Sequence, residues 1–98
     1  MMTPEGKAKK QIVEYLKSIN AWYFIPVSNG LGRHGIPDII VCLEGRFIAL
    51  EVKAQGKRGA KDRGATPLQM IQINQIKDAG GVAAVVDCVE EVKELLCS

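Results

Sequence analysis

The chain has 98 residues, of which 47% are hydrophobic and 24% are charged, with 13 Lys and Arg against 11 Asp and Glu. This length provides for one compact domain, so we expect residues 1–98 to fold as a single unit that carries the whole function. The composition is globular and the apolar runs are too short to cross a bilayer, which excludes membrane-spanning and disordered proteins.

Cysteine usage and the amino terminus indicate a reduced compartment. The three cysteines form no C-x-x-C pair and are odd in number, which does not fit a disulfide framework. The chain opens without the apolar segment of a signal peptide, so we expect a cytoplasmic location. Because so short a chain buries a modest fraction of its surface, dimerisation would help its stability.

The first half of the chain predicts one helix and three strands. Thr3 and Pro4 are typical of a helix start, and apolar residues at helical spacing extend the helix to about Ile19. A glycine-rich loop is expected over 28–35, and a Glu44-Gly45 turn joins the last two strands as a hairpin. The expected strands cover residues 21–27, 36–43 and 46–54.

The second half predicts a basic loop, two helices and one more strand. Residues 55–65 have no hydrophobic periodicity, so we expect a mobile basic loop. Thr66-Pro67 repeats the helix-start pattern, and this helix ends at Gly80-Gly81. Residues 82–86 form a buried strand, after which Asp87 caps a final helix. The expected order is therefore α-β-β-β-α-β-α.

The predicted hairpin places two carboxylates opposite each other. With Glu44-Gly45 at the centre of the turn, Asp38 faces Glu51, and Lys53 shares their face of the sheet. Opposed carboxylates repel, and a divalent cation between them removes the repulsion. Carboxylate oxygens and a backbone carbonyl suit Mg²⁺ or Mn²⁺. An ordinary strand end and a charged strand edge are the alternatives for each motif taken alone.

Two polar residues lie on helix faces that ought to be apolar. Glu5 precedes Ile12 by seven residues, which puts it in line with the core-facing stripe, although a carboxylate placed for the helix dipole is an alternative. Gln69 shares the face of Ile73 and Ile76, so it either contacts a site or is a satisfied core amide.

The ordered set of motifs resembles a known group of nucleases. Pro37-Asp38 and Glu51-Val52-Lys53 on consecutive strands resemble the PD-(D/E)xK nuclease superfamily. More narrowly, the chain resembles the VRR-NUC family through Gly35-Ile36-Pro37-Asp38, Thr66-Pro67-Leu68-Gln69 and Ala79-Gly80-Gly81-Val82. The resemblance implies an α/β fold with a restriction-endonuclease-like αβββαβ core, in which helices flank a mixed four-stranded sheet, plus a C-terminal helix.

The resemblance also implies an activity, that of a Mg²⁺- or Mn²⁺-dependent DNA endonuclease leaving 5′-phosphate and 3′-hydroxyl ends. Asp38, Glu51 and the Val52 carbonyl would bind the metal, and Lys53 would orient or activate the attacking water. The remaining assignments are Glu5, which would hold a metal-bound water or a second ion, and Gln69, which would orient Lys53 or the water.

The expected substrate is branched DNA such as a Holliday junction, cut by a homodimer of a minimal, stand-alone phage or bacterial type. Two-fold symmetry would present two sites to such a branch. Nucleic-acid contacts are predicted from charge and loop position for Lys57, Arg58, Lys61, Arg63, Arg33, His34 and Asn29. The alternatives are a non-catalytic nucleic-acid-binding module, an accessory dimerisation module, and a flap or non-selective DNA nuclease.

Overall fold

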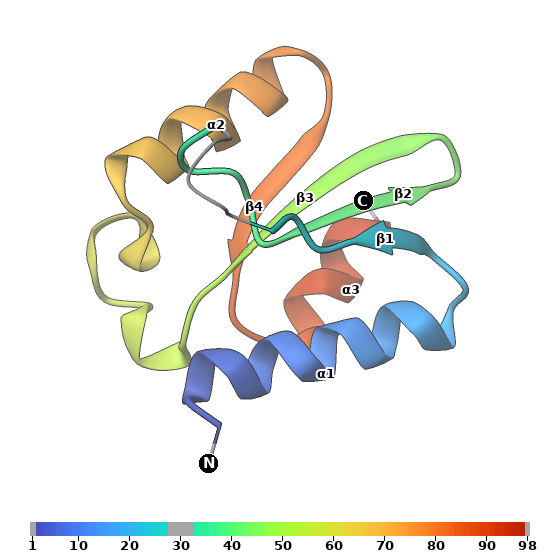
Figure 1. Cartoon of the computed structure of the whole chain (residues 1–98), viewed down its shortest axis with the longest axis horizontal. Coiled ribbons are helices and arrows are strands. Elements are labelled where there is room, and N and C mark those ends of the chain that lie inside the picture. The colour runs from blue at the N-terminus through green and yellow to red at the C-terminus, as the bar shows by residue number, and fades with distance from the viewer. Residues whose placement is uncertain (1, 28–32, 98) are drawn as a thin grey trace.

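The computed structural model describes residues 2–27 and 33–97 and places a four-stranded sheet between helices (Figure 1). Helices α1 and α3 pack on one face of the sheet and α2 packs on the other. In chain order the elements are α1 (Pro4–Ser18), β1 (Trp22–Phe24), β2 (Ile39–Leu43), β3 (Arg46–Val52), two 3₁₀ turns η1 (Gln55–Lys57) and η2 (Lys61–Gly64), α2 (Pro67–Asp78), β4 (Val82–Val86) and α3 (Val89–Cys97). The predicted order of helices and strands is confirmed.

The sheet is mixed, as expected. Its strands lie in the order β1-β2-β3-β4, with antiparallel pairs β1–β2 and β2–β3 and a parallel pair β3–β4. The hairpin turn has φ of 52° at Glu44 and 78° at Gly45, which matches the right-handed twist of the flanking strands. The resulting register pairs Ile39 with Leu50, so the predicted hairpin register is confirmed.

The strands are shorter than the sequence predicts. Strand β1 covers only residues 22–24, and β3 ends at Val52. Strand β2 begins at Ile39, three residues late, because Pro37 has no N–H to give to a ladder. Asp38 therefore lies in a bend directly before β2, where its side chain is free to turn toward β3.

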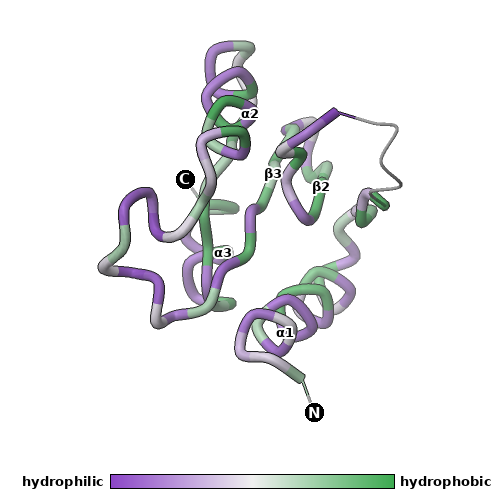
Figure 2. The backbone as a smooth tube through the Cα atoms, turned by 60° about the vertical axis from the view of Figure 1, so that its left-hand side comes forward, coloured by the Kyte–Doolittle hydropathy of each residue, from purple (hydrophilic) through white to green (hydrophobic). Residues whose placement is uncertain are grey.

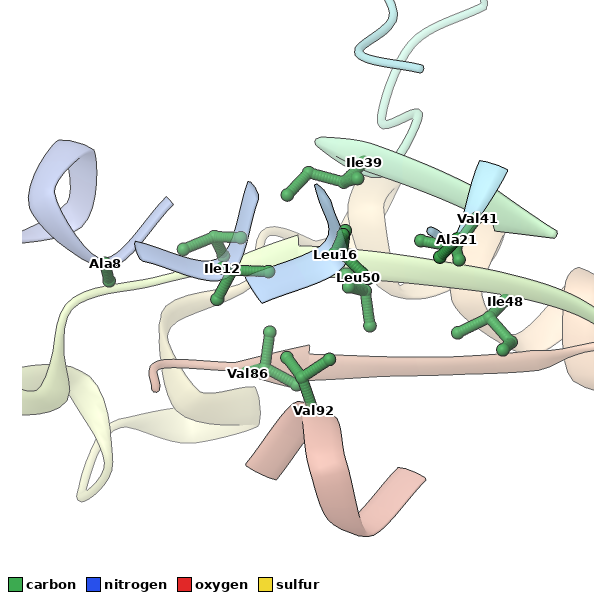
Figure 3. Packing of buried hydrophobic residues seen from close by; sticks show 11 residues of the cluster. Ala8, Ile12, Leu16, Ala21, Ile39, Val41, Ile48, Leu50, Val86 and Val92 are labelled. Atoms are coloured by element: carbon green, nitrogen blue, oxygen red, sulfur yellow. The ribbon is translucent and has the colours of Figure 1, made fainter. Parts of the chain in front are cut away.

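The core on the α1 and α3 side is the larger of two. Figure 3 shows side chains from α1, β2, β3, β4 and α3 meeting in one layer, with Ile12, Leu16 and Val92 facing the sheet. All three side chains are fully buried. On the other face, Ile73 of α2 packs against a smaller cluster that includes Ala49 of β3.

Of the two interpretations of Glu5, the structure fits the exposed carboxylate in the first turn of α1 rather than a buried one. The stripe is buried at Ala8, Ile12 and Leu16, but Glu5 is exposed in the first turn. Thr3 caps this turn by accepting a hydrogen bond from Gly6 N at 3.0 Å. The helical direction of Glu5 was predicted correctly, but the buried stripe begins only at Ala8, about one turn after Glu5.

The sequence predicts a mobile basic loop over 55–65. It is largely hydrophilic and lies at the periphery of the molecule (Figure 2), but it forms η1 and η2. None of the helices in the described ranges combines the length and hydrophobicity that a membrane span requires.

Candidate metal and catalytic site

Asp38 and Glu51 come together where β2 begins and β3 ends. The ladder starts at Ile39 opposite Leu50. The next residues outward are Asp38, in the bend before β2, and Glu51, near the end of β3. Asp38 Oδ2 accepts a hydrogen bond from Val52 N at 2.8 Å. This contact fixes the half-buried Asp38 carboxylate beside the end of β3, as the predicted pairing requires.

Glu51 is buried, with 1% of its surface exposed. Its Oε2 lies 3.6 Å from Lys53 Nζ and accepts a hydrogen bond from Gln69 Nε2 at 3.0 Å. Burial and the charge of Asp38 raise the pKa of Glu51 to about 8, against the opposing effect of Lys53. The site therefore brings together the predicted residues Asp38, Glu51, Lys53 and Gln69.

Gln69 joins the first turn of α2 to the buried carboxylate. Thr66 Oγ1 accepts from Gln69 N at 3.2 Å, and Gln69 Oε1 accepts from Thr66 N at 2.8 Å, which completes a capping box. The same side chain gives its Nε2 to Glu51. The inward direction predicted for Gln69 is thus confirmed, and its partner is Glu51 rather than Lys53.

Gly35 sets the distance between the Asp38 bend and α2. Its φ is 79°, and a Cβ at this position would lie 2.4 Å from Leu68 O. Only glycine permits both this backbone conformation and this approach. The glycine of the predicted Gly35–Asp38 motif therefore holds that motif against the first turn of α2.

The donor set fits a divalent cation. Glu51 Oε1 is buried and has no hydrogen-bond partner among residues 2–27 and 33–97, a costly state for a carboxylate oxygen. The Asp38 and Glu51 carboxylates and the neighbouring Val52 carbonyl supply the hard oxygen ligands that Mg²⁺ and Mn²⁺ prefer. These three residues would hold the ion.

A second acidic group, formed by Asp87, Cys88 and Glu91, already has cationic partners. Its potential ligand atoms lie within 4.8 Å of one another. However, the Asp87 carboxylate binds Arg58 and Arg63, and Glu91 Oε1 binds Arg63 Nη2 at 2.9 Å. Guanidinium groups therefore occupy the positions from which a metal would be bound.

The arginines of the basic loop turn toward Asp87. Arg58 gives Nε and Nη2 to the two Asp87 oxygens at 2.6 Å each, and Arg63 Nη2 lies 2.6 Å from Oδ2. The helix-capping role predicted for Asp87 is wrong, since α3 begins at Val89 and the Asp87 carboxylate binds arginines. The mobility of the basic loop stays a prediction. The sequence does not show which distant charged residues contact each other, so the pairing of Asp87 with Arg58 and Arg63 was missed.

The remaining predicted residues lie at the surface. Lys57 and Lys61 are exposed on the basic loop. Arg33 and His34, which precede β2, are exposed as well. Asn29 lies outside the residues that the structure describes. The Glu5 side chain makes no hydrogen bond or ion pair with any residue of the described ranges, so its role at the metal site stays a prediction.

The geometry defines a small α/β domain in which opposed carboxylates and a lysine meet at the end of a central hairpin. No family model matches the chain, and no curated protein matches it. A solved structure described as a VRR_NUC domain superimposes with a TM-score of 0.75 at 22% sequence identity, covering 97% of this chain and 96% of the other. The chain therefore has the VRR_NUC domain fold, which confirms the fold class expected from the sequence.

Proposed function

We propose that this chain is a divalent-metal-dependent DNA endonuclease of the VRR-NUC type. The observation that carries the proposal is Glu51, whose buried Oε1 has no hydrogen-bond partner in the part of the chain that the structure describes, while Asp38 is held beside it by its hydrogen bond with Val52 N. The fold shared with a VRR_NUC domain supports it, because the predicted metal ligands come together within that fold.

The proposed reaction is hydrolysis of a phosphodiester bond, leaving a 5′-phosphate and a 3′-hydroxyl. When bound, Mg²⁺ or Mn²⁺ would neutralise the non-bridging oxygens and lower the pKa of water. Asp38 and Glu51 would bind the ion. Lys53 provides a cation that stabilises the charge developing on the phosphate. Gln69 keeps the Glu51 carboxylate in place through the capped start of α2.

The substitution Glu51→Ala tests the activity. We expect the wild-type chain to cut labelled DNA in Mg²⁺ and to leave it intact in EDTA, and we expect Glu51→Ala to lower the cleavage rate by about 100-fold or more. Glu90→Ala, which removes an exposed glutamate of α3, is the matched control and retains activity. Cleavage that survives in Glu51→Ala would contradict the site, and binding without cleavage in every divalent metal would indicate a non-catalytic nucleic-acid-binding module.

The proposed substrate is branched DNA, bound by a homodimer. Trp22, Phe24 and Phe47 are 59%, 46% and 48% exposed, and the register through Cys42 places Trp22 and Phe47 on one row of the sheet. An apolar face of this kind favours a protein partner, and a second copy would present two sites to the arms of a junction.

The substrate assignment depends on comparing four-way junction, flap and linear duplex at equal concentrations. We expect the junction to be cut fastest, by a species that sediments as a dimer. Trp22→Lys on the apolar face would yield monomers and would abolish the junction preference. A dimer that cuts linear duplex as fast as a junction would overturn the substrate assignment without affecting the proposed chemistry.

Exposed cations are proposed to contact the DNA backbone. Lys57, Lys61, Arg33 and His34 fit this role because their side chains are exposed. Arg58 and Arg63 fit it less well, since Asp87 holds both guanidinium groups. Replacing Lys61 by Gln should weaken binding to all DNA sequences alike and should reduce its dependence on salt.

A further inference from the structure

The geometry points to Asp87 as a positioning residue of the proposed nuclease site. It acts through its ion pairs with Arg58 and Arg63, which belong to the segment that joins Lys53 to Gln69. The inference rests on the proposed function and extends it to a residue that lies outside the metal ligands. Asp87 itself contacts neither Asp38 nor Glu51 in any hydrogen bond or ion pair of the described residues. Its effect on the site must therefore pass through the segment that it binds.

The contacts join one buried carboxylate, that of Asp87, to two arginines. Only 2% of the Asp87 side chain is exposed, against 52% for Arg58 and 31% for Arg63. Arg63 also gives Nη1 to Val85 O at 3.1 Å, and Glu91 Oε1 accepts from Asp87 N at 2.8 Å. A bidentate pair and a second guanidinium on one buried carboxylate fix both halves of the segment to the end of β4.

The backbone of the segment is strained where Arg63 enters the cluster. Asp62 and Arg63 have φ of 50° and 54°, and Gly64 follows with φ of 90°. Consecutive non-glycine residues in the left-handed region are unfavourable and persist only where the surroundings impose them. The contacts of Arg63 with β4 and α3 supply that constraint. The segment is thus held in a conformation that it would not keep alone.

Both ends of this segment belong to the proposed site. At its start, Lys53 N donates to Val86 O at 3.0 Å, and Val86 directly precedes Asp87. At its end, Ala65 is buried with 8% exposure and leads into Thr66, which forms the capping box with Gln69. Lys53 and Gln69 are also the two groups that contact the buried Glu51 oxygen.

Loss of the Asp87 charge would leave two guanidinium groups without their buried partner. The segment would then relax from its strained conformation, and Gln69 and Lys53 would lose their fixed distances to Glu51. Misplacement of such supporting groups lowers the rate of the chemical step, since the reacting groups must be held in place. Substrate affinity depends on other surfaces and would change little.

Kinetics of Asp87→Asn test the inference below its unfolding temperature, with the folded fraction checked by circular dichroism. We expect kcat for Mg²⁺-dependent cleavage to fall by about 10-fold to 100-fold while KM for DNA stays within about twofold. Asp78→Asn, which changes an exposed aspartate at the end of α2, should leave both constants unchanged. A rise in KM with unchanged kcat would overturn the inference and would assign Arg58 and Arg63 to DNA binding.

Arg58→Lys provides a second test that does not depend on how well Asp87→Asn folds. Lysine keeps the charge but loses the bidentate contact, so we expect a kcat between those of the wild type and of Asp87→Asn. A kcat equal to that of the wild type would contradict a positioning role of the contact between Arg58 and Asp87. This graded response distinguishes positioning from a general loss of stability, which the folded fraction would report instead.

A spectroscopic readout separates this inference from the proposed activity. In ¹⁵N–¹H spectra of the metal-free protein, Asp87→Asn should shift or broaden the side-chain amide signals of Gln69 and should speed hydrogen exchange at the Lys53 amide. Asp78→Asn should change neither. If the wild type cuts no DNA, the proposed function fails while these signals still decide the inference, and unchanged signals in Asp87→Asn would overturn it.

Discussion

Glu51 has a buried carboxylate, one oxygen of which has no hydrogen-bond partner among the described residues. Burial and the charge of Asp38 both oppose its ionisation and raise its pKa to about 8. Lys53 and Gln69 compensate only one of its two oxygens. Without a cation, folding must therefore bury a charge or take up a proton, and either event costs free energy. The cost is the physical reason to expect a metal at this residue.

The substitution Glu51→Gln removes this cost while keeping the size of the side chain. In EDTA at neutral pH we expect its free energy of unfolding to exceed that of the wild type by about 1–3 kcal/mol. Mg²⁺ should raise the Tm of the wild type, because it binds the native state, and should leave the Tm of the variant unchanged. Thermal unfolding with and without Mg²⁺ measures both effects, with Glu90→Gln as the control. Equal Mg²⁺ shifts in both proteins would place the metal elsewhere.

At the scale of elements, the site depends on how the bend before β2 meets the start of α2. Asp38 belongs to the bend and Gln69 to the helix, and each contacts the end of β3. Gly35 is the point of contact, since its position leaves no room for a Cβ beside Leu68 O. The packing of two backbone segments thus fixes the distance between two side chains of the site.

Alanine at Gly35 should therefore impair both stability and activity. Gly35 and Gly45 have almost the same φ and provide a matched comparison. A Cβ at Gly35 would meet Leu68 O at 2.4 Å, whereas a Cβ at Gly45 would meet no atom of the described residues within 4 Å. We expect Gly45→Ala to cost about 1 kcal/mol through φ alone, and Gly35→Ala to cost about 1–3 kcal/mol more. Urea unfolding measures the difference. Equal losses would show that the contact with α2 does not constrain the bend.

At the scale of the whole molecule, the sequence could predict what depends on local pattern. Helix caps and periodicity gave the order of the elements, and the Glu44-Gly45 turn gave the register that sets Asp38 beside Glu51. Periodicity gives the direction of a side chain but not the extent of the core beneath it, so it could not decide whether Glu5 is buried or is an exposed carboxylate in the first turn of α1, as the structure has it.

Contacts between distant charges could not be predicted in the same way. Arg58 and Arg63 lie 29 and 24 residues before Asp87, and a count of charges indicates a basic loop without naming its partner. The apolar residues of β4 also gave no sign that the next carboxylate would be buried. Such pairings are decided by the packing of β4 and α3 against the loop, which is a property of the complete fold.

The Asp87 cluster should make the stability of the whole domain sensitive to acid. Hydrogen bonds from Arg58, and then from Arg63, hold the pKa of Asp87 well below its usual range in spite of burial. The native state therefore binds fewer protons than the unfolded state at acidic pH, so the stabilisation is complete above the unfolded pKa of about 4 and is lost as the pH falls through the lower native pKa. We expect the wild type to resist urea better than Asp87→Asn at pH 7, and this difference to narrow steadily below pH of about 4. Unfolding midpoints of wild type, Asp87→Asn and Asp78→Asn across this range measure the effect, and a difference that stays constant down to the acid limit would show that the arginines do not hold the Asp87 carboxylate ionised.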